Sequence, residues 1–355
     1  MVDGWAPGIK AEGEERRVSR ALCFVRMYAG DNAYAYPLTG LIPVVDLNTM
    51  EVIRIEDYGA KPLPPMDASF KFENSDDLEP RSDLKPIDIT QPEGPSFETD
   101  GHFIKWQKWN IRFGYTAREG LVLHQVSYED KGEERPVLYR AALSEMVVPY
   151  GETSPAHNWQ NALDAGEYGI GQLANSLTLG CDCLGEVRYF NAVMADGKGD
   201  VHTIPNAICL HEEDDGTAWK KTDWRTDEGE ERRSRRLVLS FFATVLNYDY
   251  GFYWYFYTDG RIEQEVKLTG ILNVGALEEG EKPKYGTEVA PRINGPIYQH
   301  FFNFRLDMNV DGQKNSVVEL NTVAEKEGSD NPNKNAFHPV TTTFKKEKDR
   351  AQHGS

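Results

Sequence analysis

Asp-Gly pairs recur between alternating or aromatic-rich runs, and this turn signal constrains the fold of the chain more than any other feature. Asp259-Gly260 separates the aromatic run 252–257 from the run 262–268, and an Asp-Gly loop readily takes the positive φ angles of a tight hairpin. Further hairpins are predicted at Asp100-Gly101, Asp196-Gly197 and Asp311-Gly312. Helical periodicity is scarce, so the pattern predicts a mainly β protein with a large antiparallel β-sandwich.

The part of the chain before this sandwich has a different composition. Residues 16–27 are expected to form a short helix, followed by strands at 41–47 and 52–55, so residues 1–61 are predicted to be a small α+β domain. Residues 62–95 are rich in proline and acidic side chains. This composition is typical of a connecting segment, and we place the domain boundary there.

The sandwich domain is expected to occupy residues 96–355. Its last portion, from about Ala324, is charged and polar and has too few apolar residues to fold alone. We therefore expect the chain to stop before the domain is complete.

The charge balance argues against nucleic acid as a partner, and the lack of long apolar runs argues against a membrane. The chain has 39 Lys and Arg against 57 Asp and Glu, a formal net charge of −18, which disfavours nucleic acid. No run approaches the roughly 18 apolar residues of a membrane helix, and the N-terminus lacks the apolar core of a signal peptide. The expected location is therefore intracellular, cytoplasmic or peroxisomal. An acidic surface suits cationic ligands such as amines, although such a surface most often serves solubility.

Four cysteines are too few for a secreted disulfide scaffold, and the Cys181-Asp-Cys183 pair has no second pair that would complete a zinc signature. Composition alone is compatible with buried thiols and also with one structural disulfide.

The sequence Asn-Tyr-Asp-Tyr at 247–250 follows an apolar run, and read by itself Tyr248 is an ordinary strand tyrosine in an aromatic core. The tetrapeptide resembles the Asn-Tyr-(Asp/Glu)-Tyr motif of copper amine oxidases, with Thr244 three residues before Asn247. This resemblance implies that Tyr248 is the precursor of topaquinone and that Asn247 helps to orient its ring. It also implies oxidation of primary amines by dioxygen to aldehyde, ammonia and hydrogen peroxide.

A second segment, YGETSPAHNWQNALDAGEYG at 150–169, resembles the family segment that carries the catalytic base, which matches Asp164. A carboxylate suits this role because partial burial raises its pKa toward the operating pH. Tyr150 matches the tyrosine that hydrogen-bonds the quinone. The resemblance also implies a set of substrate-channel residues: Ala162, Asp164, Gly166, Tyr168, Gly169 and Tyr250.

The resemblance extends through residues 180–224. Within this stretch Cys183 and Cys209 match a pair that is disulfide-bonded in the family, and their separation in sequence neither supports nor excludes the bond. The acidic run 212–215 is expected to be a solvated turn. The arginine-rich run 232–236 is expected to form internal ion pairs.

Copper in this family is held by three histidines, two of them in a His-x-His pair. Here the pair reads Tyr298-Gln299-His300. Alternation along a strand puts 298 and 300 on one face, but a phenol with a pKa near ~10 must lose a proton before it binds copper well. We therefore predict His300 as a copper ligand and Tyr298 as a poor one. The third histidine is expected beyond Ser355.

Asp307 and Met308 match a peripheral cation site of the family, which takes calcium or manganese. Family members are homodimers, so the resemblance implies a homodimer here. Because the copper ligands are incomplete, the 355-residue chain alone is predicted to be inactive, with Tyr248 unmodified.

Two other hypotheses stay open. The chain could be an inactive β-sandwich pseudoenzyme or fragment that acts as a binding partner of an intact oxidase. It could also be a carbohydrate-binding or glycosidase sandwich, although the sequence offers no convincing carboxylate pair for that chemistry.

Overall fold

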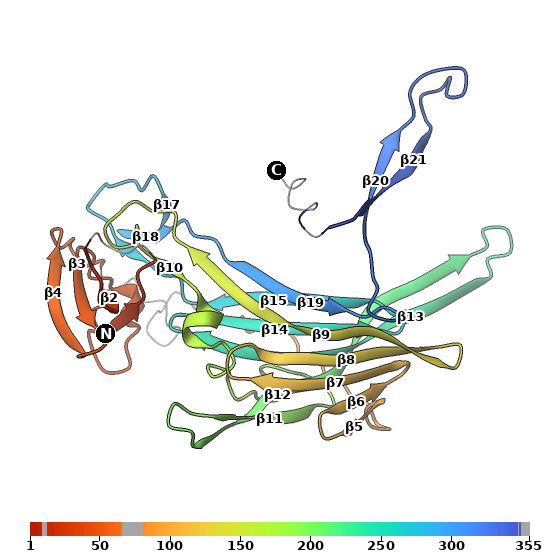
Figure 1. The fold of residues 1–355 in the computed structure, drawn as a ribbon, viewed down its shortest axis with the longest axis horizontal. Helices are drawn as coiled ribbons and strands as arrows, with labels where there is room; N and C mark the ends of the chain where they lie inside the picture. Colours follow the sequence, from red (N-terminus) through yellow and green to blue (C-terminus); the bar gives the residue numbers. More distant parts are fainter. Residues whose placement is uncertain (9–12, 66–80, 347, 349–355) are drawn as a thin grey trace.

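The computed structural model describes residues 1–8, 13–65, 81–346 and 348. These residues form antiparallel sheets, and the two largest sheets pack face to face as a sandwich (Figure 1). The predicted mainly β sandwich is confirmed. No helix in the described part of the chain has the length and apolar character that crossing a membrane requires.

The first sandwich sheet follows the order β10-β9-β8-β7-β6-β5, and β19 pairs with β9. Its strands are β5 (Phe97–Asp100), β6 (Phe103–Trp106), β7 (Trp109–Thr116), β8 (Gly120–Asp130), β9 (Glu133–Pro149), β10 (Asn161–Ala162) and β19 (Phe301–Met308). A π-helical turn, η4 (Asp164–Tyr168), follows β10.

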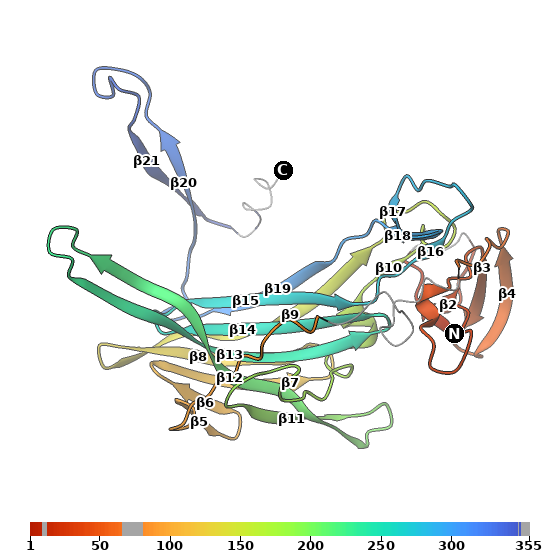
Figure 2. The same cartoon turned by 180° about the vertical axis from the view of Figure 1, so that it is seen from behind.

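The second sandwich sheet runs in sequence order from β11 to β15. Its strands are β11 (Arg188–Ala195), β12 (Val201–Thr222), β13 (Gly229–Val245), β14 (Tyr248–Tyr257) and β15 (Ile262–Gly270). The long hairpin of β12 and β13 extends beyond the sandwich (Figure 2).

Three smaller sheets complete the fold. The N-terminal sheet has the order β1-β2-β3-β4, the C-terminal hairpin pairs β20 with β21, and a small sheet has the order β16-β18-β17. The 3-10 turn η1 lies between β2 and β3 in the chain. Their elements are β1 (Val2–Trp5), β2 (Val18–Cys23), η1 (Ala33–Ala35), β3 (Leu41–Asp46), β4 (Glu51–Asp57), β16 (Gly275–Ala276), β17 (Gly286–Ala290), β18 (Ile293–Pro296), β20 (Val317–Ala324) and β21 (Phe337–Phe344).

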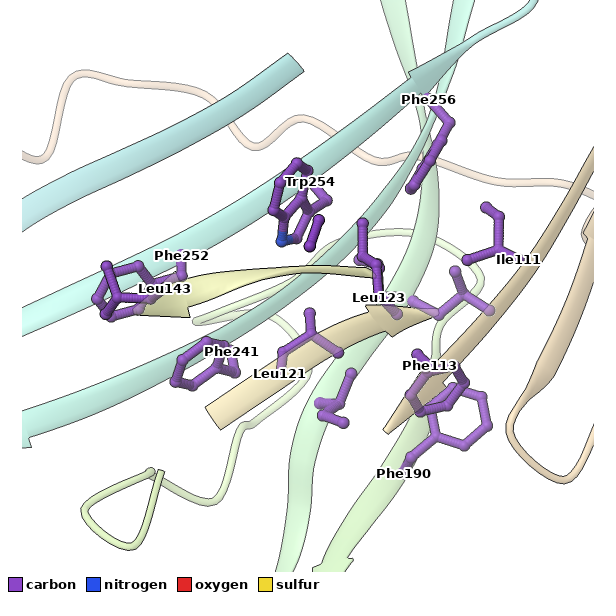
Figure 3. Packing of buried hydrophobic residues seen from close by; sticks show 14 of the residues in the cluster. Ile111, Phe113, Leu121, Leu123, Leu143, Phe190, Phe241, Phe252, Trp254 and Phe256 are labelled. Carbon is purple, nitrogen blue, oxygen red and sulfur yellow. The ribbon is translucent and has the colours of Figure 1, made fainter. Parts of the chain in front are cut away.

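The sandwich core is aromatic, and strand alternation explains why. Phe252, Trp254 and Phe256 of β14 point inward against Leu121 and Leu123 of β8 (Figure 3). The intervening tyrosines of β14 form a separate cluster on the outer face of the sheet. Burial of each large apolar side chain stabilises the fold by about 1.5–3 kcal/mol. Strand β14 is buried on both of its faces, so it lies at the centre of the domain.

Three of the four predicted hairpins are confirmed. Asp259-Gly260 joins β14 to β15, and the pairs at 100–101 and 196–197 join β5 to β6 and β11 to β12. The prediction of a hairpin at 311–312 is wrong. The strands on its two sides, β19 and β20, do not pair with each other: β19 pairs with β9, and β20 pairs with β21. Asp311 forms an ion pair with Arg135 instead, so the chain is anchored near the start of β9 and then leaves the sandwich.

The helix predicted at residues 16–27 is also wrong. Val18–Cys23 forms β2, which pairs with β1 on one side and β3 on the other. Backbone partners on both edges override a weak helical pattern. The β3–β4 hairpin is confirmed, and η1 is the one helical element in the described part of residues 1–61.

The connecting segment has neither strand nor helix at 62–65 and 81–95, while residues 66–80 of this prediction lie outside the described residues. The tail after Ala324 was expected not to fold alone, yet β21 pairs with β20 in a hairpin that stands away from the sandwich (Figure 1). The pairing satisfies backbone groups without a core, and Phe337 stays exposed.

The prediction of a solvated turn at 212–215 is wrong, because these residues belong to β12. Glu212 is buried and accepts hydrogen bonds from Trp106 Nε1 at 2.9 Å, Ser96 N at 2.7 Å and Gln91 Nε2 at 2.7 Å. Burial alone would raise the pKa of Glu212, but these hydrogen bonds outweigh burial and lower it. Glu212 is thus a carboxylate that ties the segment before β5 to the sandwich.

The predicted internal ion pairs of the arginine-rich run are confirmed. The pairs are Arg232 with Glu230, Arg233 with Asp214, Arg235 with Glu212 and Arg236 with Glu213.

Replacing Glu212 with alanine is expected to lower the free energy of unfolding by about 3 kcal/mol, because three donors and a cation lose their buried acceptor. Urea denaturation at pH 7 measures the change. The loss is expected to shrink as the pH falls through the lowered pKa of Glu212, since protonation removes the same charge. Glu98→Ala, at an exposed position of β5, is the control and should stay within about 0.5 kcal/mol of the parent.

Candidate active site

Tyr248 is the first residue of β14, and a glycine shapes the backbone around it. Tyr248 lies opposite Gly270 in the register of β14 and β15. Gly270 has a φ of 93°, and a Cβ there would lie 2.6 Å from the carbonyl oxygen of Asn247. Glycine tolerates both the conformation and the close approach, so the end of β15 can close tightly over the Asn247–Tyr248 backbone.

The hydroxyl of Tyr248 is fixed by two groups from distant parts of the chain. It lies 3.0 Å from the hydroxyl of Tyr150, which follows β9, and it accepts a hydrogen bond from the backbone N–H of Asn273 at 3.4 Å. Burial, followed by the neighbouring phenols of Tyr150 and Tyr298, raises the pKa of Tyr248. Tyr248 is therefore a neutral, oriented phenol, and the predicted Tyr150 partner stands at its oxygen.

The hydrogen bonds of Asn247 join it to the chain that follows β15. Its side-chain Nδ2 donates to the carbonyl oxygen of Ile271 at 2.7 Å, and Ile271 N donates back to the carbonyl oxygen of Asn247 at 2.7 Å. These bonds hold the loop that carries Asn273. Through this loop Asn247 influences the backbone donor that holds the Tyr248 hydroxyl.

Asp164 begins η4 and is buried, with 1 % of its surface exposed. Desolvation, with smaller contributions from the charges of Glu167 and Glu145, raises the pKa of Asp164 to about 7, although a hydrogen bond from Tyr250 opposes the shift. In the described part of the chain, its Oδ1 has no hydrogen-bond partner. A carboxyl group poised near neutrality with one free oxygen is suited to accept a proton.

Tyr250 links the two sides of the site. Its hydroxyl lies 3.3 Å from Asp164 Oδ2 and 3.1 Å from His300 Nδ1. The ring of His300 stands edge-on to Tyr248, with 5.2 Å between ring centroids. The structure therefore gathers Tyr150, Asp164, Tyr248 and His300 around one buried tyrosine.

The donors around His300 do not fit a copper site by themselves. Burial lowers the pKa of His300 to about 4, so its imidazole is neutral and able to bind a metal. Burial raises the pKa of Tyr298, whose ring lies 5.2 Å from His300 and stacks on Tyr150 at 4.9 Å. A protonated phenol is a weak ligand for copper. The described residues thus offer one good imidazole here.

A pocket of about 340 Å³ opens beside the Tyr248 ring. It is lined by Tyr248, Tyr250, Leu268, Thr269, Gly270, Ile271, Leu272, Tyr298 and His300. Asp164 is not part of this lining, but Tyr250, which lies 3.3 Å from Asp164 Oδ2, is.

The residues predicted to line a substrate channel gather around η4. Ala162 is buried at the end of β10, Gly166 N donates to Glu145 Oε1 at 2.9 Å, and the Tyr168 hydroxyl donates to the carbonyl oxygen of Gly4 at 3.4 Å. Gly169 ends η4 with a φ of 74°. Of the predicted channel set, only Tyr250 also lines the pocket described above.

The sequence did not identify two residues that contact the site tyrosines. Asn273 supplies a backbone donor to Tyr248, and His157 stacks on Tyr150 with ring centroids 5.6 Å apart while it bonds Glu152. A backbone donor has no residue signature. His157 lies in the segment 150–169, five residues after Glu152. This spacing was the sequence signal that could have identified the pair.

The structure gathers few candidate ligands at the predicted peripheral cation site. Asp307 and Met308 end β19, where Asp307 lies opposite Arg140. Within the described ranges, no group of three His, Cys, Asp or Glu ligands includes Asp307. The predicted disulfide between Cys183 and Cys209 is confirmed.

The chain matches known proteins in sequence and in fold. The sequence profile "Copper amine oxidase, enzyme domain" matches residues 98–354, and "Copper amine oxidase, N3 domain" matches residues 1–74. Primary amine oxidase of Arthrobacter sp. (strain P1) is 51% identical over 320 residues, which cover 89% of this chain and 49% of that protein. N-methylputrescine oxidase 1, peroxisomal, of Nicotiana tabacum is 47% identical over 360 residues, with 98% and 45% covered.

The solved structure of a copper-containing benzylamine oxidase from Hansenula polymorpha matches with a TM-score of 0.87 and 34% identity, covering 97% of this chain and 55% of that one. The chain spans about half the length of these relatives. Both profile matches and the long, highly identical alignments show that the chain belongs to the copper amine oxidase family.

Proposed function

We propose that this protein oxidises primary amines with dioxygen to aldehyde, ammonia and hydrogen peroxide, with Tyr248 as the precursor of its topaquinone and with copper as its metal. The observation that carries the proposal is the fixed Tyr248 ring, whose hydroxyl lies 3.0 Å from that of Tyr150 and whose neighbour Tyr250 is hydrogen-bonded to Asp164. The names of the relatives, among them primary amine oxidase and histamine oxidase, support amines as the substrate class.

The chain's own residues supply the acid–base part of this reaction. A quinone made from Tyr248 would provide the electrophilic carbonyl that takes the amine nitrogen. Tyr150 and Asn273 N hold the oxygen of the ring. Asp164, with a pKa raised to about 7, accepts the proton from the carbon that bears the amine, a role for which a base near the operating pH is best suited.

The test is the mass of the peptide that contains Tyr248, measured after the protein is incubated with copper under air, together with amine-dependent peroxide release. The proposal expects added oxygen on Tyr248 and peroxide in the presence of amine. Tyr248→Phe should abolish both. Tyr253→Phe, on the outer face of the same strand, is the matched control and should leave both unchanged. An unmodified Tyr248 in the parent contradicts the proposal for this chain and agrees with the prediction that its incomplete copper ligands leave it inactive.

A non-catalytic partner of an intact oxidase is the second candidate, and Tyr298 is the observation that favours it. The phenol stands beside His300, with ring centroids 5.2 Å apart, where the resemblance leads us to expect a second imidazole. This candidate expects an unmodified Tyr248 and no peroxide in the same assay.

The finer assignments are proposals of the same kind. We infer a homodimer, for which β19, β20 and β21 offer exposed apolar side chains, namely Phe301, Leu306, Val317, Leu320 and Phe337. We propose Asp307 and Met308 as ligands of a calcium or manganese ion.

The domain division and the location also remain proposals. We propose a division at 1–61, 62–95 and 96–355, and Ala162, Asp164, Gly166, Tyr168, Gly169 and Tyr250 as the substrate-channel residues. The names of the Nicotiana and Pichia angusta relatives support a peroxisomal location over a cytoplasmic one.

A further inference from the structure

The cluster of Cys183, Cys209 and His211 lies outside the site described above. A ligand atom from each residue lies within 4.8 Å of the other two, and all three residues are buried. Cys209 and His211 alternate with Leu210, which belongs to the sandwich core. They therefore face the outer side of the five-stranded sheet, whereas Tyr248 belongs to the inner core cluster.

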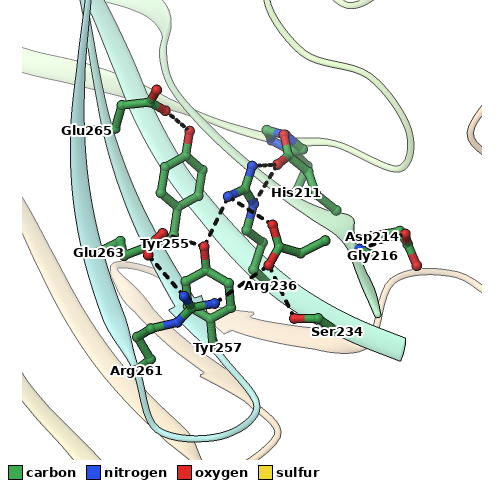
Figure 4. Close-up of polar contacts among 12 residues, drawn as sticks. His211, Asp214, Gly216, Ser234, Arg236, Tyr255, Tyr257, Arg261, Glu263 and Glu265 are labelled. Atoms are coloured by element: carbon green, nitrogen blue, oxygen red, sulfur yellow. Dashed lines mark hydrogen bonds and ion pairs between the residues drawn. The ribbon is translucent and has the colours of Figure 1, made fainter. Parts of the chain in front are cut away.

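A carboxylate and an arginine orient the imidazole of this cluster. His211 Nε2 lies 3.1 Å from Glu213 Oε1, and Arg236 Nε donates to Glu213 Oε2 at 2.8 Å. Figure 4 shows His211 and Arg236 joined in this network on the outer face. Glu213 Oε1 is thus placed to accept a hydrogen bond from a protonated Nε2 of His211.

A proton held on Nε2 leaves the lone pair of Nδ1 free, and Nδ1 lies 3.4 Å from Cys209 Sγ. An imidazole whose far nitrogen donates to a carboxylate is the usual arrangement of a metal-binding histidine. Two sulfurs and such a nitrogen are the donors that Zn²⁺ prefers in proteins.

We propose that reduction of the Cys183–Cys209 disulfide converts this cluster into a buried Zn²⁺ site with two thiolates and His211 Nδ1 as ligands. A dithiol supplies the two electrons and two protons that break the S–S bond and becomes a disulfide itself. Zinc then replaces the two thiol protons, which are released to solvent. Three protein ligands leave the fourth tetrahedral position to water.

The experiment compares zinc uptake by the oxidised and the reduced protein. A background with Cys23→Ser and Cys181→Ser removes the two free cysteines and keeps only the cluster thiols. The protein is dialysed against Zn²⁺ without oxygen, and bound zinc is measured by atomic spectroscopy. We expect one more zinc ion per reduced chain than per oxidised chain, and any zinc held by histidines elsewhere cancels in this difference.

Two variants separate ligation from structure. Glu213→Gln should weaken zinc binding by about 10–100-fold, and His211→Asn should weaken it further because a ligand is lost. Both retain the disulfide, so their near-ultraviolet circular dichroism in the oxidised state checks the fold. Equal zinc uptake by oxidised and reduced protein would overturn the proposal, as would His211→Asn with the affinity of the parent.

Discussion

Asp164→Asn is expected to slow amine oxidation by about 10²–10⁴-fold, the usual contribution of a positioned general base, without loss of the oxygen added to Tyr248. Asparagine keeps the size of the side chain and can still accept the hydrogen bond from Tyr250. It cannot take up a proton at neutral pH. Steady-state peroxide release measures the rate, and the peptide mass of Tyr248 shows that the cofactor precursor was processed.

The rate of amine oxidation should also depend on pH. Only the carboxylate form of Asp164 accepts a proton, so the parent rate should fall as the pH drops below about 7, where the pKa of Asp164 lies. Glu167→Gln removes a nearby charge that raises this pKa. That control should keep the rate at alkaline pH and move the acid limb to lower pH. An Asn variant with parental rates would rule out Asp164 as the base.

The same raised pKa affects stability with a definite sign. A carboxyl group whose pKa is higher in the folded state binds more protons there between about pH 4 and pH 7. Its contribution to stability is fully present below the unfolded pKa and is lost as the pH rises through 7. Asparagine does not titrate, so the variant should gain stability relative to the parent as the pH rises from about 4 to about 7.

Tyr298→His is expected to raise copper affinity by about tenfold or more, a change of about 1.4 kcal/mol. The substitution exchanges a protonated phenol for a neutral imidazole beside His300, whose low pKa already leaves it free to bind. Copper per chain after equilibrium dialysis measures the effect. Gln299→His places an imidazole one residue away and is the matched control. Equal affinity in the two variants would show that position 298 does not hold the metal.

Local patterns predicted the sandwich better than they predicted the site. Asp259-Gly260 and the alternation along β14 are short-range signals, so the β14–β15 hairpin and its two faces follow from the sequence. The helix prediction for residues 16–27 failed because the backbone partners that make β2 a strand lie on β1 and β3. Glu212 looked solvated because its donors lie 106 to 121 residues away.

The site itself depended on resemblance. Tyr150 and Tyr248 are 98 residues apart and Asp164 and Tyr250 are 86 residues apart, and no periodicity connects them. Asn273 contributes a backbone N–H, which every residue except proline possesses. Such contacts become visible only once the sheets are assembled.

The hydroxyl of Tyr250 has a single proton to share between Asp164 and His300. When Asp164 is a carboxylate, Tyr250 donates to it and can only accept from His300, which keeps the histidine proton on Nδ1. When Asp164 is protonated, Tyr250 can donate to Nδ1 and the histidine proton moves to Nε2. Proton uptake on one side of Tyr250 therefore selects the tautomer of His300 on the other, and with it the nitrogen whose lone pair is exposed.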